Sequence, residues 1–112
     1  MSRQPIWTGV YPAVTTKFTA EGALDIPAFM HNIRAQVEAG AQGIIIGGSL
    51  GESSTITHEE RLILLAAVLD EYGEQVDVIL NVAEGSTARA IELTQKAEAA
   101  GAHGIMLLPP MM

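Results

Sequence analysis

The chain alternates short, unbroken apolar runs with longer stretches in which apolar residues recur every three or four positions. Short apolar runs bounded by glycine or proline are typical of buried strands, and the longer periodic stretches are typical of helices. This pattern predicts strands at residues 6–16, 43–47, 76–82 and 104–108. Helices are expected between them, each ending just before Gly40, Gly73 or Gly101.

The helix starts have recognisable capping residues. Asp25 can cap the first helix, with Pro27 in its first turn. Thr57 and Glu60 form the Ser/Thr-x-x-Glu pattern of a capping box at the start of the second. Gly85-Ser86 opens the third helix, for which we expect a buried face made of the following residues: Ala90, Ile91, Thr94, Ala97 and Ala100.

The order of these elements is β-α-β-α-β-α-β. The strands at 43–47 and 104–108 are apolar throughout, which is expected where helices bury a parallel sheet from both faces. Residues 38–44 also resemble residues 99–105, with the shared unit "helix end, Gly, Ala, any residue, Gly, strand". The offset of 61 residues equals two β-α units, as in a β/α barrel.

Composition narrows the class of protein. A chain of 112 residues forms at most one domain, and 48% apolar with 17% charged residues indicates a packed core. The net charge of −7 disfavours nucleic acid and anionic membranes as partners. The chain has no cysteine, no signal-like apolar segment and no run of about 18 apolar residues, so we expect a soluble cytoplasmic protein.

The glycine-rich loop at residues 47–52 follows an apolar strand, and ligands bind at the carboxyl ends of strands in such folds. The Ser49 hydroxyl and the N–H groups of Ser49, Leu50 and Gly51 could hold a carboxylate or phosphate. The loop could equally be an ordinary turn that needs glycine. It is neither a P-loop nor a dinucleotide fingerprint, because the lysine and the glycine spacing of those motifs are absent.

Other polar residues at strand ends are candidates for the same region. Glu52 is either a general base or, with Gly48, a residue that shapes the loop. Thr16 and Asn81 follow or end strands on the same side as the loop, and each could face the site or have a structural role. Neither of the two lysines, Lys17 and Lys96, has the apolar or cationic surroundings that a Schiff-base lysine needs.

The three histidines, His31, His58 and His103, have no metal-ligand spacing, so no metal site is expected.

Several of these residues form motifs that occur together in one known family. The chain resembles the N-terminal part of the dihydrodipicolinate synthase / N-acetylneuraminate lyase family. The resemblance rests on these motifs, in order: Thr16-Lys17-Phe18, Gly22-x-x-Asp25, Gly40-x-x-Gly43, Gly48-Ser49-Leu50-Gly51-Glu52-Ser53, Glu60-Arg61, Ala100-Gly101-Ala102-x-Gly104 and Pro109-Pro110. It implies an eight-stranded β/α (TIM) barrel, usually a homotetramer, in which a lysine forms an imine with pyruvate or a related 2-oxo acid. Aldol addition, aldol cleavage or dehydration follows, without metal or organic cofactor.

The resemblance also implies roles for individual residues. Ser49 and Leu50 occupy the two hydroxyl positions of the loop that holds the substrate carboxylate, and only Ser49 keeps the hydroxyl. Lys17 replaces a proline, and Met111-Met112 stand where the synthases usually carry two tyrosines, so Met112 becomes a candidate lining residue. These departures favour a divergent aldolase or dehydratase over a strict dihydrodipicolinate synthase.

In that family the imine lysine comes from a later strand than the chain contains. We therefore expect residues 1–112 to form a single N-terminal half-barrel, with about the first four strands and three helices and without the nucleophile. The chain would be a fragment of a longer enzyme, or two copies would pair to close the barrel. Two other hypotheses remain: a non-catalytic, self-assembling half-barrel with residual anion binding, and a β/α barrel enzyme that binds phosphate, which the lack of a basic loop residue disfavours.

Overall fold

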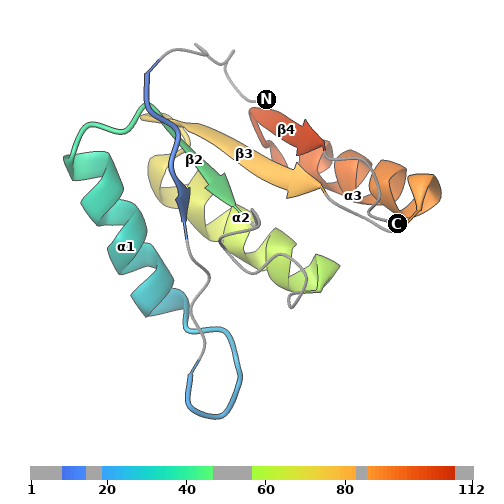
Figure 1. The fold of residues 1–112 in the computed structure, drawn as a ribbon, viewed down its shortest axis with the longest axis horizontal. Coiled ribbons are helices and arrows are strands. Elements are labelled where there is room, and N and C mark those ends of the chain that lie inside the picture. Colours follow the sequence, from blue (N-terminus) through green and yellow to red (C-terminus); the bar gives the residue numbers. More distant parts are fainter. Residues whose placement is uncertain (1–8, 15–18, 47–56, 83–85, 108–112) are drawn as a thin grey trace.

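A computed structural model describes residues 9–14, 19–46, 57–82 and 86–107 as one parallel sheet with helices on one side (Figure 1). The elements are β1 (Ala13–Val14), α1 (Ile26–Glu38), β2 (Gly43–Ile46), α2 (His58–Tyr72), β3 (Asp77–Val82), α3 (Thr87–Ala100) and β4 (Gly104–Leu107). The sheet order is β1-β2-β3-β4, and every neighbouring pair is parallel. The predicted parallel α/β class is confirmed, and the arrangement is that of a partial β/α barrel.

Both predicted helix caps are present. The Asp25 side chain accepts a hydrogen bond from the Ala28 N–H at 3.0 Å, at the start of α1. At the start of α2, the Glu60 N–H donates to Thr57 Oγ1 at 3.1 Å, and the Thr57 N–H donates to Glu60 Oε1 at 2.9 Å. These contacts satisfy N–H groups that the first helical turn leaves without partners.

The buried face of α3 differs from the one predicted. Leu93 and Ala97 are fully buried, whereas Ile91 is 52% exposed. Residues 93 and 97 are one helical turn apart and therefore share a face, which excludes position 91. Packing against the sheet thus selects the narrower stripe that contains Leu93. The prediction was wrong for Ile91 and for Ala100, which is also exposed.

β1 is shorter than the strand predicted at residues 6–16. Only Ala13–Val14 pair in regular register with β2. The preceding residues still border β2, since the Val10 carbonyl accepts from the Gln42 N–H at 2.9 Å. The Pro12 carbonyl accepts from Ile45 at 2.9 Å, but proline has no N–H to return, which interrupts a regular ladder.

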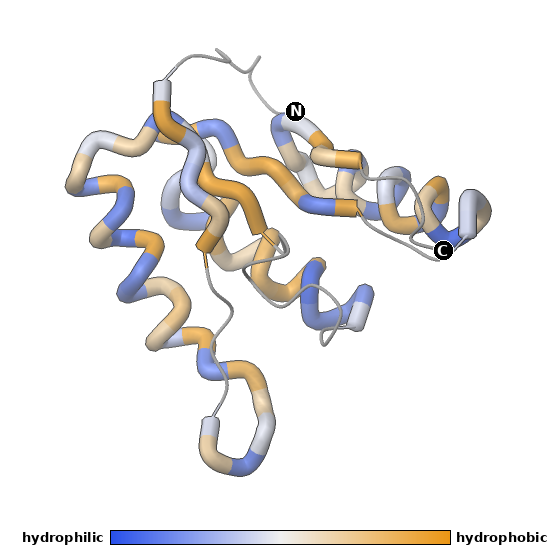
Figure 2. The backbone as a smooth tube through the Cα atoms, in the orientation of Figure 1, coloured by the Kyte–Doolittle hydropathy of each residue, from blue (hydrophilic) through white to orange (hydrophobic). Residues whose placement is uncertain are grey.

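The two faces of the sheet have different surroundings. One face packs against all three helices and forms the core, with the strand residues Val14, Ile44, Ile46, Val78, Leu80 and Val82. In Figure 2, much of the length of β2 and β3 is coloured as hydrophobic. The other face carries the alternate strand residues, and no helix of the described residues covers it. In a closed barrel this would be the interior.

None of the helices in the described part of the chain is long and apolar enough to cross a membrane.

Candidate functional site

The strands place one edge of the sheet where ligands bind in β/α barrels. All four strands are parallel, so their carboxyl ends lie along the same edge. β2 ends at Ile46, directly before the glycine-rich loop in the sequence. β4 ends at Leu107, and β3 ends at Val82, next to Asn81.

Asn81 is the one predicted site residue that the structure describes. It is fully buried, and its register partner in β4 is Met106. Its neighbours Leu80 and Val82 belong to the core beneath the helices, so Asn81 lies on the opposite, inner face of the sheet. An amide near the carboxyl end of that face is suitably placed to line a barrel mouth.

The remaining predicted site residues lie outside the described part of the chain: Thr16, Gly48, Ser49, Leu50, Gly51, Glu52 and Met112. The carboxylate-binding loop therefore stays a prediction from the sequence. The structure contributes the position of the strand that leads into it.

The inner face contains an open hollow of about 350 Å³. Its lining comprises Gly9, Tyr11, Ile45, Ile79, Ile105 and Met106. Ile45 and Ile79 are register partners in neighbouring strands, so they form one layer across the sheet. This apolar lining is typical of the packed interior of a β/α barrel.

At the amino-terminal end of the same face, a polar contact joins β3 to the segment before β1. The Tyr11 hydroxyl donates to Asp77 Oδ2 at 2.5 Å, and Asp77 is only 1% exposed. Gly43 in β2 lies between them, because a Cβ there would come closer than 3.0 Å to the Tyr11 ring. Sequence reasoning missed this contact; the glycine at the start of β2 was its only local signal.

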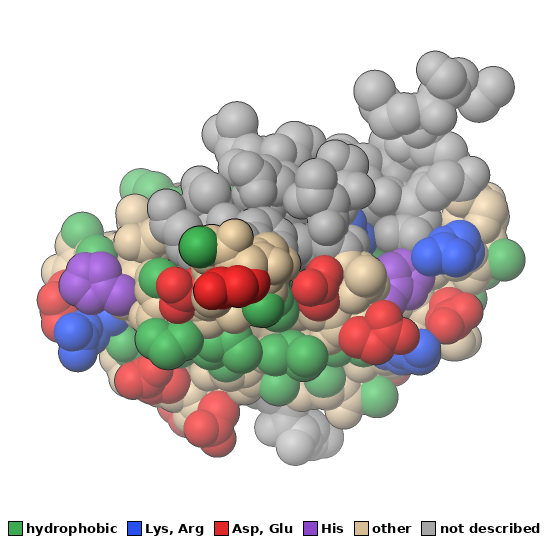
Figure 3. Space-filling view, turned by 90° about the horizontal axis from the view of Figure 1, so that it is seen from below, with side chains coloured by type: hydrophobic (Ala, Val, Ile, Leu, Met, Phe, Trp, Pro, Cys, Tyr) green, Lys and Arg blue, Asp and Glu red, His purple; other side chains and the backbone are tan. Residues whose placement is uncertain are grey.

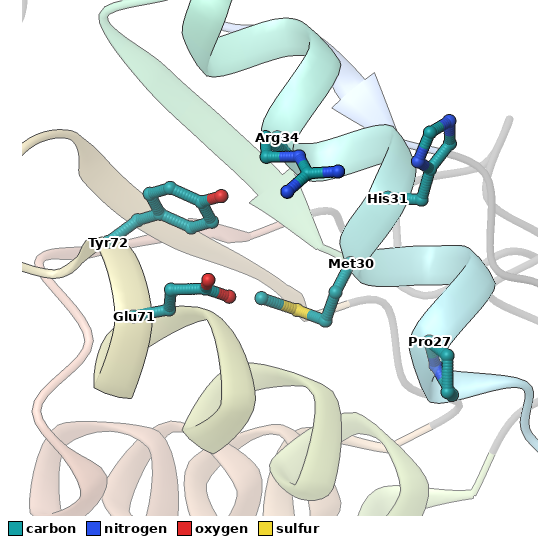
Figure 4. Close-up of a pocket in the computed structure, with 6 residues that line it drawn as sticks. All are labelled: Pro27, Met30, His31, Arg34, Glu71 and Tyr72. Carbon is teal, nitrogen blue, oxygen red and sulfur yellow. The ribbon is translucent and has the colours of Figure 1, made fainter.

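A second hollow, of about 250 Å³, lies between α1 and α2 on the helical side (Figure 4). The Arg34 side chain and the Tyr72 hydroxyl approach each other across it, with Glu71 and Met30 below. Burial raises the pKa of Tyr72, Glu71 raises it further, and Arg34 opposes both. This hollow belongs to the outer surface and not to the face that carries Asn81.

The described lysine is a surface residue. Lys96 lies in α3, its side chain is 49% exposed, and its Nζ is 3.0 Å from Glu92 Oε1. Lys96 thus lacks apolar surroundings, as expected from the sequence, and such an exposed position does not desolvate an amine for imine formation. Lys17 lies outside the described residues.

Within the described residues, no three His, Cys, Asp or Glu side chains are grouped so that they could hold a metal ion.

Charge on the outer surface is predominantly negative. On the face seen in Figure 3, acidic side chains are more frequent than basic ones, with hydrophobic side chains between them. This agrees with 13 acidic against 6 basic residues in the whole sequence. A polyanion would be repelled from this face.

Known proteins resemble this chain in both sequence and structure. The sequence matches the Dihydrodipicolinate synthetase family over residues 7–112. The 4-hydroxy-tetrahydrodipicolinate synthases of Kineococcus radiotolerans and Acidothermus cellulolyticus are 44% and 43% identical over 101 residues, which is 90% of this chain and 33% of theirs. This chain thus spans about a third of the length of these relatives.

Solved structures agree with the sequence match. A prophage protein of the dihydrodipicolinic acid synthase family from E. coli K12, in complex with pyruvate, is 36% identical with a TM-score of 0.85. The match covers 93% of this chain and 35% of that one. The dihydrodipicolinate synthase of Acinetobacter baumannii, also complexed with pyruvate, gives a TM-score of 0.88 at 27% identity, over 93% of this chain and 36% of its own. With nearly the whole sequence matched, the chain belongs to the Dihydrodipicolinate synthetase family.

Proposed function

We propose that this chain is part of a lyase that forms a Schiff base with pyruvate or a related 2-oxo acid. The observation that carries the proposal is family membership over residues 7–112, together with two solved relatives that hold pyruvate. The parallel sheet supports it, because the predicted loop follows β2 at the edge where barrel enzymes bind ligands. We expect the enzyme to be cytoplasmic and to form a homo-oligomer.

The loop after β2 would hold the carboxylate of the 2-oxo acid. In the proposed site, the Ser49 hydroxyl and the N–H groups of Leu50 and Gly51 donate to the carboxylate oxygens. Gly48 and Glu52 keep the loop in shape. Fixing the carboxylate orients the neighbouring carbonyl carbon for attack by an amine.

The imine would act as an electron sink for carbon–carbon or carbon–oxygen bond cleavage. From the family resemblance, we expect its lysine to come from a strand beyond residue 112, and Lys96 is solvated on α3. Asn81, Thr16 and Met112 are proposed to line the space above the imine. Asn81 has the best support, because it is buried on the inner face near the carboxyl end of β3. The chemistry needs neither metal nor organic cofactor.

Two sequence features favour a divergent aldolase or dehydratase. Leu50 offers one hydroxyl fewer to the carboxylate, and Met111-Met112 cannot relay protons as tyrosines can. A reaction that needs no proton relay at residues 111 and 112, on a substrate whose carboxylate is held by one side-chain hydroxyl, would tolerate both changes.

Borohydride trapping tests the proposal. In the longer protein that contains this chain, pyruvate and borohydride should convert one lysine beyond residue 112 into a stable secondary amine, detected by peptide mass spectrometry. Ser49→Ala should raise the pyruvate concentration needed for half-maximal trapping, while Ser86→Ala, at the start of α3, should leave it unchanged. An adduct on Lys17 or Lys96, or no adduct at all, contradicts the proposal.

The open inner face favours a second candidate, a non-catalytic half-barrel that assembles with itself and retains anion binding. Within the described residues, β1 and β4 each have one strand neighbour, and the hollow of about 350 Å³ lies open on the inner face. Strand edges that have no neighbour, and an open apolar face, favour association with a second chain. Sedimentation of the 112-residue chain would reveal a dimer in this case, and a stable monomer would exclude it.

A further inference from the structure

The turn before β4 contains a histidine that bonds both polar backbone groups of one residue in β3. The His103 N–H donates to the Val78 carbonyl at 2.9 Å. In return, the Val78 N–H donates to Nδ1 of the His103 ring at 2.9 Å. The regular pairing of the two strands begins one position later, at Ile79 and Gly104. His103 therefore extends the β3–β4 ladder with its side chain.

This geometry fixes the protonation state of the ring. Nδ1 accepts a hydrogen bond only through its lone pair, so the neutral ring carries its proton on Nε2. Protonation of Nδ1 would place an N–H against the Val78 N–H and break the contact. Val78 is fully buried, so its N–H would lose its partner without gaining water.

A comparison of the two internal repeats shows which hydrogen bond is specific to His103. Gln42 holds the equivalent position before β2, and its N–H donates to the Val10 carbonyl at 2.9 Å. The hydrogen bond from the backbone N–H of this residue to a carbonyl in the neighbouring segment is thus common to both repeats. Of the two positions, only His103 adds an ionisable acceptor, its imidazole ring.

We infer that His103 is a proton-sensitive clip that fastens the start of β4 to β3 when neutral and releases it when protonated. At the same end of the sheet, the ionisable side chains of the described residues include Asp77, adjacent to Val78, and Tyr11, which is bonded to Asp77. Glu74 and Glu98, at the ends of α2 and α3, are exposed. In the sequence, β4 is followed directly by residues 108–112. The state of His103 would therefore control how firmly the strand that precedes Met112 is bound to β3.

Amide hydrogen exchange followed by NMR tests this inference directly. Protection factors, which already correct for the intrinsic effect of pH on exchange, are compared at about pH 7.5 and about pH 5, which lie on either side of the pKa of about 6.5 that an unperturbed imidazole has. In the unmodified protein, protection of the Val78 amide should fall roughly tenfold at the lower pH, the effect of losing one hydrogen bond. The Leu80 amide, deeper in the β3–β4 ladder, serves as the internal reference and should change little.

Three variants separate the clip from other causes. In His103→Asn, the amide oxygen can replace Nδ1 and does not titrate, so Val78 should stay protected at both pH values. His103→Leu should lose protection at both. Asp77→Asn should keep the pH dependence, because Asp77 is not the titrating group. Equal protection of Val78 at both pH values in the unmodified protein, or loss of the pH dependence in Asp77→Asn, overturns the inference. The protection factors of the unmodified protein and of the variants do not depend on enzymatic turnover. This test is therefore independent of the test of the proposed lyase activity.

Discussion

Replacing Gly43 with alanine should destabilise the fold through a clash and not through backbone strain. Gly43 is not among the described glycines with positive φ, so alanine can adopt its backbone conformation. The added Cβ would instead lie closer than 3.0 Å to the Tyr11 ring and 2.7 Å from the Asp77 carbonyl oxygen. The ring must then move, and the hydrogen bond from Tyr11 to Asp77 is lost.

The expected loss of stability in Gly43→Ala is the sum of two contributions. Forcing an extra methyl group into a packed site costs about 1–3 kcal/mol. Loss of the hydrogen bond from Tyr11 removes one partner of the buried Asp77 side chain and adds roughly 1–3 kcal/mol. The sum, about 2–6 kcal/mol, is a large fraction of the 5–15 kcal/mol that typically stabilises a domain. Tyr11→Phe removes only the hydrogen bond and should cost about half as much.

Urea unfolding of Gly43→Ala and Tyr11→Phe, followed by circular dichroism, measures both changes. The control is Gly40→Ala, where φ is +100° and nothing lies within 4 Å of the added Cβ, so only backbone strain of about 1–2 kcal/mol is expected. The double variant Gly43→Ala/Tyr11→Phe should be less destabilised than the sum of the single variants, because both remove the same hydrogen bond. If Gly43→Ala costs no more than Gly40→Ala, the reasoning is refuted.

Three further predictions concern the helices. Thr57→Ala removes an acceptor of the α2 capping box and should lower stability by about 1 kcal/mol in a thermal melt; an unchanged midpoint would contradict the role of the cap. Leu93→Ala should cost about 2–5 kcal/mol and Ile91→Ala much less, because Leu93 is fully buried and Ile91 is 52% exposed; similar losses in urea would mean that α3 is rotated. The hydrogen bond and charge of Lys96 lower the pKa of Glu92, so this pair stabilises the fold above the unfolded carboxyl pKa and ceases to do so as pH falls through the lowered value. Lys96→Ala should raise the pKa of Glu92 in an NMR titration, and an unchanged value would show that the pair is not formed in solution.

Local signals in the sequence were sufficient for the helices and the class of fold. The caps at Asp25 and Thr57 depend on contacts within three residues, so their chemistry can be read directly from the chain. The unbroken apolar run Gly43–Ile46 indicated a strand beneath helices, and the parallel sheet agrees. The linked motifs also identified the family before any fold was known.

Contacts between distant segments were decided only by the tertiary structure. Tyr11 and Asp77 are 66 residues apart, and whether they meet depends on strand order and register, which no local pattern encodes. The same applies to His103, which bonds a residue 25 positions away. The face of α3 was misjudged at Ile91 because helical periodicity permits several stripes and only packing against β3 selects one. The sequence by itself thus determined the elements and their class, while the pairing of side chains across the sheet required the fold, because those contacts arise only when separate strands come into register.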